Sequence, residues 1–286
     1  MKISLANLPT DRQAELRQIT DTIVQAIHPE KIILFGSYAT GRWVADKYVA
    51  GHITYEYQSD FDILVVTSRG EKREDHQVEE MLESKCQHLT SIPVNIIAHG
   101  IDYANKQIGE GQYFFTDIKK EGILLWDAGK VELAEQRELT PAEKKEIVER
   151  DFKKWFSTSK EFLKRASILD NNDSETLNIS AFLLHQATER TYNTMILVFT
   201  GYKPKTHNIA KLIKMSRDFS PELATIFPNN SKEEKHLFTL LKKAYIDARY
   251  SEDYMITEKE LKALIERVKR LQEVTERVCR KKIEEF

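Results

Sequence analysis

Two short motifs in the first quarter of the chain have the residue types needed to hold a metal ion and a phosphate group. Gly36 and Ser37 follow one short apolar segment, and Asp60 and Asp62 begin another. Because strand side chains alternate, carboxylates two residues apart project to the same side of a strand. Two like charges held close together favour a shared cation, and Mg²⁺ binds carboxylate oxygens. The sequence therefore predicts Asp60 and Asp62 as the metal ligands and the catalytic pair.

The glycine-serine pair is predicted to bind the phosphates of a nucleotide. Gly36 lets the backbone approach a phosphate, and Ser37 offers a hydroxyl and an amide as donors. Beside a Mg²⁺ site, this motif predicts phosphoryl or nucleotidyl transfer, in which catalysis consists mostly of positioning and charge neutralisation. The expected ligand is ATP or another NTP. The alternative is that an Asp-x-Asp pair stands at a strand end by coincidence.

The elements that must position these residues form a small mixed α/β sheet in the first half of the chain. Short apolar runs predict strands, and apolar residues at helical spacing predict helices. Residues 48–57 alternate around Ala50-Gly51 and predict an inserted hairpin. The expected strands cover 31–35, 61–67, 93–98 and 122–126, and the expected helices cover 14–27 and 71–89.

The second half is predicted to be helical almost throughout. Thr140, Pro141 and Glu143 have the pattern of a helix start. Sustained heptads are absent, so we expect a bundle and not a coiled coil. The fold class is thus an α/β (α+β) mixed sheet followed by an all-α bundle, with domains at 1–128 and 141–286 and a linker at 129–140. The expected helices cover 141–169, 174–200, 207–217, 231–250 and 257–283.

Composition restricts the other classes of function. The formal net charge is −2, so no polybasic arm or acidic tail dominates the chain. The two cysteines, Cys86 and Cys279, lie in different halves, which excludes a disulfide framework and a cysteine zinc site. No apolar run is long enough to span a bilayer. We expect a cytoplasmic protein with no membrane partner.

The first half resembles the nucleotidyltransferase superfamily of DNA polymerase beta type, in its minimal prokaryotic form. The Gly-Ser then Asp-x-Asp pattern of that family matches Gly36, Ser37, Asp60 and Asp62. The resemblance implies that Gly-Ser contacts the NTP phosphates, that the acidic pair holds Mg²⁺, and that a third carboxylate stands on the next strand. In this sequence that position is Asn95, and 22 residues separate Ser37 from Asp60. Glu56 and Asp102 are the candidates for a replacement.

The second half is similar to HEPN domains, helical bundles often fused to minimal nucleotidyltransferases. The similarity rests on segments beginning at Phe182, Gly201 and Thr206, and on Ala248-Arg249-Tyr250 through Tyr254. Ribonuclease members use an Arg followed four to six residues later by His, usually in a dimer interface. Here Tyr254 takes the place of that His. Arg249 is therefore predicted to bind a nucleotide or another polyanion. The alternative is a bundle that serves as a scaffold or for dimerisation, and a homodimer is left open.

Three functions follow as alternatives. The first is Mg²⁺-dependent NTP binding with nucleotidyl transfer to an acceptor, which is a small molecule, an RNA or a protein. The second is a nucleotide-binding regulatory protein without turnover, because Asn95 cannot accept a proton as a carboxylate would. The third is a ribonuclease, in a fusion that resembles a toxin–antitoxin pair.

Overall fold

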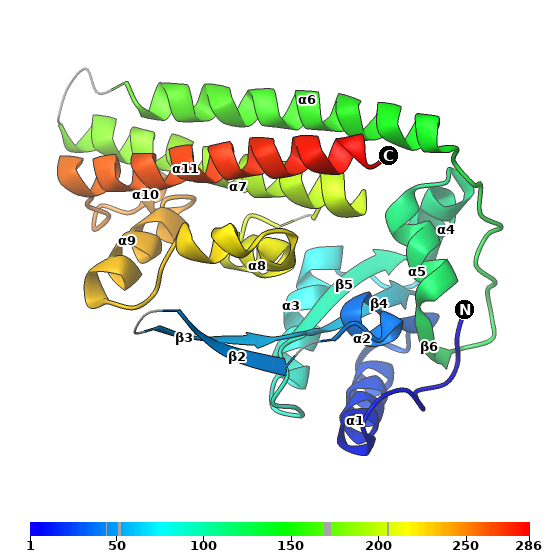
Figure 1. The fold of residues 1–286 in the computed structure, drawn as a ribbon. Helices are drawn as coiled ribbons and strands as arrows, with labels where there is room; N and C mark the ends of the chain where they lie inside the picture. The colour runs from blue at the N-terminus through cyan, green and yellow to red at the C-terminus, as the bar shows by residue number, and fades with distance from the viewer. Residues whose placement is uncertain (44, 51–52, 169–172, 205) are drawn as a thin grey trace. The chain divides into compact units, whose positions relative to one another are not determined.

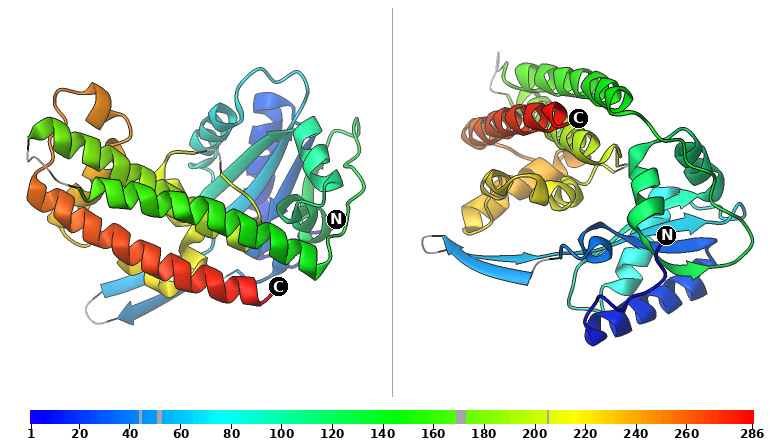
Figure 2. Two further views of the ribbon diagram at one scale, coloured as in Figure 1. Left: turned by 90° about the horizontal axis from the view of Figure 1, so that it is seen from above. Right: turned by 45° about the vertical axis from the view of Figure 1, so that its right-hand side comes forward.

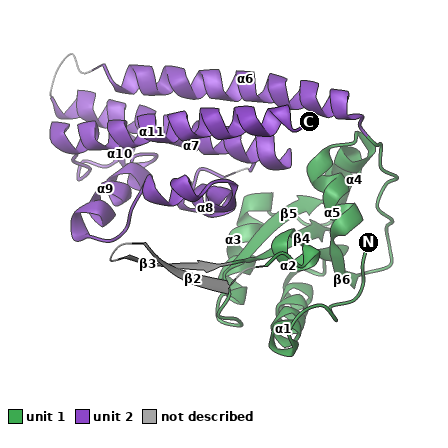
Figure 3. Cartoon of the chain, viewed as in Figure 1, with its two compact units in different colours: residues 1–138 green, residues 139–286 purple. Residues whose placement is uncertain are grey.

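The chain divides into two compact units, Met1–Glu138 (unit 1) and Leu139–Phe286 (unit 2) (Figure 3). The computed structural model describes residues 1–43, 45–50, 53–168, 173–204 and 206–286. It describes the side chains of all of these residues except 45–50 and 53–58. Unit 1 contains a mixed sheet and unit 2 is helical, which confirms the predicted fold class.

The four-stranded sheet of unit 1 has the strand order β5-β4-β1-β6. β1 is antiparallel to both of its neighbours, and β4 is parallel to β5. β2 and β3 form a separate antiparallel pair, and the side chains of the predicted hairpin lie outside the described residues. The strands are β1 (Lys31–Phe35), β2 (Ala45–Ala50), β3 (Ile53–Gln58), β4 (Phe61–Thr67), β5 (Val94–Gly100) and β6 (Ile123–Asp127).

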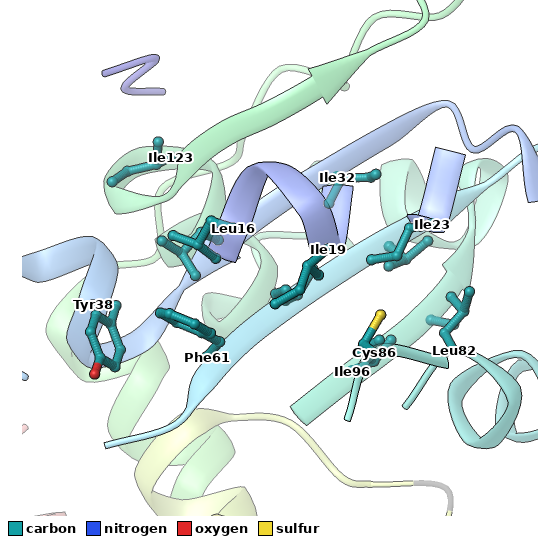
Figure 4. Close-up of a cluster of buried hydrophobic side chains, with 14 of the residues drawn as sticks. Leu16, Ile19, Ile23, Ile32, Tyr38, Phe61, Leu82, Cys86, Ile96 and Ile123 are labelled. Atoms are coloured by element: carbon teal, nitrogen blue, oxygen red, sulfur yellow. The ribbon is translucent and has the colours of Figure 1, made fainter. Parts of the chain in front are cut away.

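One face of this sheet is covered by α1 (Thr10–Ile27) and α3 (Asp75–Cys86). Their apolar residues pack against alternate residues of β1, β4 and β5 and form a buried core with them (Figure 4). Leu16 and Ile19 of α1 and Leu82 of α3 are each 0% exposed. Alternate residues of the strands and residues at helical spacing in α1 and α3 thus form one core between the sheet and these two helices.

Three short helices of unit 1 are absent from the sequence prediction. They are α2 (Gly36–Thr40), α4 (Ile101–Gly109) and α5 (Tyr113–Glu121). α4 and α5 are only nine residues long, so each contributes few repeats of the helical apolar pattern. Tertiary packing stabilises helices of this length. The aromatic segment at the start of α5 is buried: Tyr113, Phe114 and Phe115 are 6%, 7% and 2% exposed.

Both outer strands of the sheet have backbone partners outside the sheet. On β5, the backbone N–H groups of Ile96 and Ala98 donate to the carboxylates of Glu83 and Glu79, at 3.0 and 3.1 Å. On β6, Lys2 forms a bridge with Ile123. These contacts occupy hydrogen-bonding groups that an open edge would present to another strand.

The segment after β6 runs along α4 and α5 of unit 1. Asn105 of α4 donates to the carbonyl of Glu132 at 3.1 Å and accepts from the amide of Ala134 at 2.8 Å. Lys119 of α5 donates to the carbonyl of Ala134 at 2.7 Å. Residues 129–138 therefore have defined partners on unit 1, although they form no helix or strand.

Unit 2 is organised around three long helices that pack side by side (Figures 1 and 2). The shorter helices contact the central helix, α7, or join the long ones. The helices are α6 (Pro141–Ala166), α7 (Ser174–Thr200), α8 (Ile209–Ser216), α9 (Lys232–Lys243), α10 (Asp247–Tyr250) and α11 (Glu258–Glu284), with 3₁₀ turns η1 (Arg217–Phe219) and η2 (Pro221–Thr225). Their positions confirm the predicted helices to within a few residues. The differences are the 3₁₀ turns within 217–225, which were not predicted, and a break at 244–246 inside the helix predicted at 231–250.

The central helix α7 is buried on nearly every side from Leu184 to Val198. Its threonines satisfy their hydroxyl groups within the helix: Thr188, Thr191 and Thr194 donate to carbonyls four residues earlier at 2.7–2.8 Å. Such bonds let a polar residue lie in a buried interface without an unpaired donor. The predicted capping box of Thr140 and Glu143 is present at the start of α6.

No helix in the described part of the chain combines the length and the apolar character that crossing a bilayer requires.

Candidate functional site

The predicted phosphate and metal motifs meet where β1 ends and β4 begins. The antiparallel register of these strands places Phe35 opposite Asp62, so Gly36 lies beside the Asp62 side chain. Gly36 has φ of +73°, and a Cβ atom there would overlap Oδ2 of Asp62 and lie 3.2 Å from its Cγ. Only glycine meets both the backbone and the space requirement at this position. The Asp62 carboxylate is therefore packed directly against the Gly36 backbone.

Ser37 lies in the first turn of α2, directly after this glycine. Backbone N–H groups in the first turn of a helix have no partner within the helix. The Ser37 side chain is half-buried, and its hydroxyl has no hydrogen-bonding partner among the described residues. Ser37 thus offers hydrogen-bond donors directly after Gly36, which lies against the Asp62 carboxylate.

Asp60 and Asp62 flank Phe61, which is 0% exposed and belongs to the core. Strand alternation places the Asp62 side chain on the face opposite Phe61. Asp60 is 8% exposed. Burial, and to a lesser extent the charge of Asp60, raises the pKa of Tyr38 above its ordinary value, so the Asp60 carboxylate lies near the Tyr38 ring. Asp60 is thus a buried carboxylate at the start of the strand that carries Asp62.

Asn95 takes the place that the resemblance reserves for a third carboxylate. The parallel register of β4 and β5 sets it opposite Asp62, and its Nδ2 donates to Oδ1 of Asp62 at 2.9 Å. This donor stabilises the charged form of Asp62 without adding a charge. Within the part of the chain that the structure describes, no group of three or more His, Cys, Asp or Glu side chains could hold a metal ion. A cation at Asp62 would rest on two aspartates and on the oxygens of its ligand.

Of the two acidic residues considered as replacements, Asp102 does not supply the third carboxylate. Asp102 lies in α4, beyond the far end of β5 from Asn95, and is paired with Arg69 at 2.8 Å. The side chain of Glu56 lies outside the described residues.

Unit 2 contains an open pocket of about 810 Å³ between α7 and the segment around α10. Arg249 lines this pocket together with three aromatic residues, Phe182, Tyr250 and Tyr254. Its guanidinium lies 4.6 Å from the ring centroid of Phe182 and 4.9 Å from that of Tyr250. Its Nε donates to the carbonyl of Tyr245 at 2.8 Å. No described acidic side chain forms an ion pair with Arg249, so its position is fixed while its charge is not neutralised.

Tyr254, at the position where ribonuclease members have His, is a structural residue. It is 6% exposed, and its hydroxyl donates to the carbonyl of Leu240 at 3.1 Å. Burial raises the pKa of Tyr254 well above its ordinary range. The phenol therefore cannot serve as a proton carrier at neutral pH.

The contact that the sequence did not reveal joins α7 to the loop before α8. Nδ1 of His207 lies 3.0 Å from Oε2 of Glu189. The His207 ring stacks on Tyr245, with 4.4 Å between centroids and 18° between planes. The sequence suggested a helix start at Thr206–Asn208, and the Asn208 cap is present. The only signal for the rest was that His185 and Glu189 share a face of α7.

The comparisons with known proteins bear on unit 2. No curated protein matches the chain. A family model described as the HEPN domain matches residues 152–278, which lie wholly in unit 2. The match does not extend to unit 1, whose similarity to nucleotidyltransferases stays a prediction. Residues 152–278 of this chain are a HEPN domain.

Proposed function

We propose that unit 1 binds a nucleoside triphosphate together with Mg²⁺, and that transfer of the nucleotidyl group to an acceptor is its reaction. The observation that carries this proposal is the packing of the Asp62 carboxylate against Gly36, at a position where any side chain would overlap it. This packing supports the proposal, because it sets Gly36 and Ser37, the proposed phosphate-binding residues, beside a carboxylate of the kind that binds Mg²⁺.

The donor set suits Mg²⁺, which prefers oxygen ligands and shares its coordination sphere with phosphates. Asp60 and Asp62 would hold the ion, and Gly36 and Ser37 would donate to the phosphates. When bound, the ion neutralises phosphate charge during transfer. The protein contributes position: Asp60 directly precedes β4 and Asp62 lies within it, and Gly36 and Ser37 directly follow β1.

Asn95 is the residue on which the choice between nucleotidyl transfer and nucleotide binding without turnover depends. An amide accepts no proton at neutral pH, so Asn95 cannot activate an acceptor hydroxyl as a carboxylate would. The alternative of a nucleotide-binding regulatory protein follows from this residue. Under it, ATP and Mg²⁺ bind to the same residues and no pyrophosphate is released.

Titration calorimetry of the full chain with ATP tests the proposal, with Mg²⁺ present or removed by EDTA. We expect binding that requires Mg²⁺ and that Asp62→Ala abolishes. Asp21→Ala is the matched control, because Asp21 is an exposed aspartate of α1. Binding that survives Asp62→Ala, or no binding by the wild type, would refute the nucleotide site. Release of pyrophosphate then separates a transferase from a regulatory protein.

A second function is favoured by Arg249, whose charge has no acidic partner among the described residues and which lies in an open pocket beside aromatic rings. We propose that unit 2 binds and cleaves RNA there, because phosphate contacts by Arg and base stacking on aromatic rings are the main contacts of single-stranded RNA. Arg249→Ala should abolish both. Arg280→Ala, which removes a guanidinium that stacks on Phe152 and pairs with Glu276, should change neither.

A further inference from the structure

His207 and Glu189 form a hydrogen-bonded pair whose outer member is exposed. The Glu189 side chain is 10% exposed, and the His207 side chain is 57% exposed. A carboxylate accepts hydrogen bonds, so Nδ1 of neutral His207 carries the proton and Nε2 is the free acceptor. Nε2 has no partner among the residues that the structure describes. The pair therefore presents a proton acceptor of fixed orientation to solvent.

Tyr245 links this acceptor to Arg249. The His207 ring is 4.4 Å from the Tyr245 ring centroid, and the Arg249 guanidinium is 5.1 Å from the same centroid. His185 also stacks on Tyr245, at 5.2 Å, but it is 1% exposed and cannot reach a ligand. Of the two imidazoles that stack on Tyr245, only His207 is accessible.

We propose that His207 is the proton acceptor in the cleavage of RNA at Arg249, and that Glu189 positions it; this inference rests on the second function proposed above. The segment after Arg249 has no His, and His207 of the loop before α8 stacks on the same tyrosine ring that the Arg249 guanidinium contacts. Arg249 binds the phosphate. Tyr250, whose side chain is 75% exposed, offers a face on which a base stacks.

The reaction is an internal transesterification. The 2′-hydroxyl of the ribose gives its proton to Nε2 of His207, and O2′ forms a bond to the adjacent phosphorus. The bond between phosphorus and O5′ breaks, and O5′ takes a proton from water. His207 returns its proton to solvent. The products are a 2′,3′-cyclic phosphate and a 5′-hydroxyl end, so the reaction consumes no other reactant.

Cleavage of a labelled single-stranded RNA oligonucleotide by the full chain tests this assignment. A general base contributes about 10²–10⁴-fold to rate, so His207→Ala should lower kcat by at least about 10²-fold with KM unchanged. Added imidazole should restore part of the lost rate. His207→Gln, which can still donate to Glu189 but cannot accept a proton, should stay folded and inactive.

His236 provides the matched control, because it is another exposed histidine of unit 2 that is hydrogen-bonded to a glutamate, Glu260, at 2.8 Å. His236→Ala should cleave RNA at the wild-type rate. Glu189→Gln should lower kcat less than His207→Ala does, with KM unchanged and without rescue by imidazole, because the base is still present.

The outcomes separate the inference from the function on which it rests. If the wild type cleaves and both His207 variants cleave equally well, the assignment of His207 is wrong while RNA cleavage stands. If the wild type leaves the RNA intact, both are wrong. Loss of activity in His207→Ala and His207→Gln, with rescue of the alanine variant by imidazole, supports both.

Discussion

Asn95 and Asp62 lie opposite each other on neighbouring parallel strands and share a hydrogen bond of 2.9 Å from Nδ2 to Oδ1. A neutral donor thus occupies one oxygen of the carboxylate that the proposed metal site requires. A single substitution at residue 95 can therefore change the charge beside the Asp62 carboxylate.

We expect Asn95→Asp to make the stability of unit 1 depend on Mg²⁺. Without a cation, two carboxylates at hydrogen-bonding distance repel each other, so the melting temperature in EDTA should fall. Mg²⁺ should restore it, because it binds the native state and neutralises the pair. Thermal melting with and without Mg²⁺ measures both effects. The double variant Asp62→Asn with Asn95→Asp exchanges the two residue types. Because it keeps a single carboxylate, its melting temperature in EDTA should stay near that of the wild type.

Gly36→Ala should destabilise unit 1 and abolish Mg²⁺-dependent ATP binding. A non-glycine residue at positive φ costs about 1–2 kcal/mol, and the new Cβ would also overlap Oδ2 of Asp62. Gly41→Ala separates the two effects, because Gly41 has φ of +77° and a Cβ there would meet no atom within 4 Å. Urea unfolding should show a larger loss for Gly36→Ala. Equal losses, with ATP binding retained in both variants, would contradict the close packing of Asp62.

Buried His185 should make unit 2 less stable in mild acid. Burial, with smaller effects from the charges of His207 and Arg249, lowers the pKa of His185 to about 4, whereas an unfolded imidazole titrates near about 6.5. Between these values the unfolded state binds more protons. The contribution of His185 to the free energy of unfolding therefore falls as pH falls through this window, by at most about 1.4 kcal/mol per pH unit.

His185→Phe should flatten this dependence when urea unfolding is compared at pH 7 and pH 5. The substitution keeps a ring on Tyr245 and removes Nδ1, a buried atom with no hydrogen-bonding partner in the described part of the chain. His76→Phe, a change at an exposed histidine of unit 1, should leave the pH dependence of unit 2 as in the wild type. An unchanged slope in His185→Phe would show that other groups control the acid response.

Glu79→Ala should weaken unit 1 and expose the edge of its sheet. The carboxylate accepts the Ala98 amide at 3.1 Å and is 7% exposed, and an unpaired buried donor costs about 1–3 kcal/mol. The freed edge also favours pairing with another strand. Urea unfolding and light scattering measure the two effects. Glu80→Ala, at an exposed position of the same helix, should show neither.

Most of the fold could be predicted from the sequence, because its long elements repeat one periodic pattern many times. The long helices of unit 2 are of this kind, whereas the strands of unit 1 were predicted from short apolar runs. α4 and α5 were not predicted, because nine residues hold few repeats and their stability comes from packing on the sheet.

The candidate sites were predictable only where the residues are close in sequence or belong to paired strands. Gly36 and Asp62 lie side by side because Gly36 directly follows β1, Asp62 lies at the start of β4, and these two strands are paired. The pairing of His207 with Glu189 spans a loop and depends on side-chain directions that no spacing rule gives. Tyr254 shows the reverse case: its place in a motif suggested chemistry, but its burial makes it a packing residue.

The hydrogen bonds from Asn105 and Lys119 to the segment 129–138 also determine where the chain can be divided. A fragment that ends after β6 would lack the backbone groups that these side chains contact. It would also lack the segment that runs along α4 and α5. A fragment that continues to Glu138 keeps this segment and its hydrogen bonds. Limited proteolysis should therefore cut beside Leu139 before it cuts within the preceding ten residues, and the two halves of the protein are best produced separately by dividing the gene there.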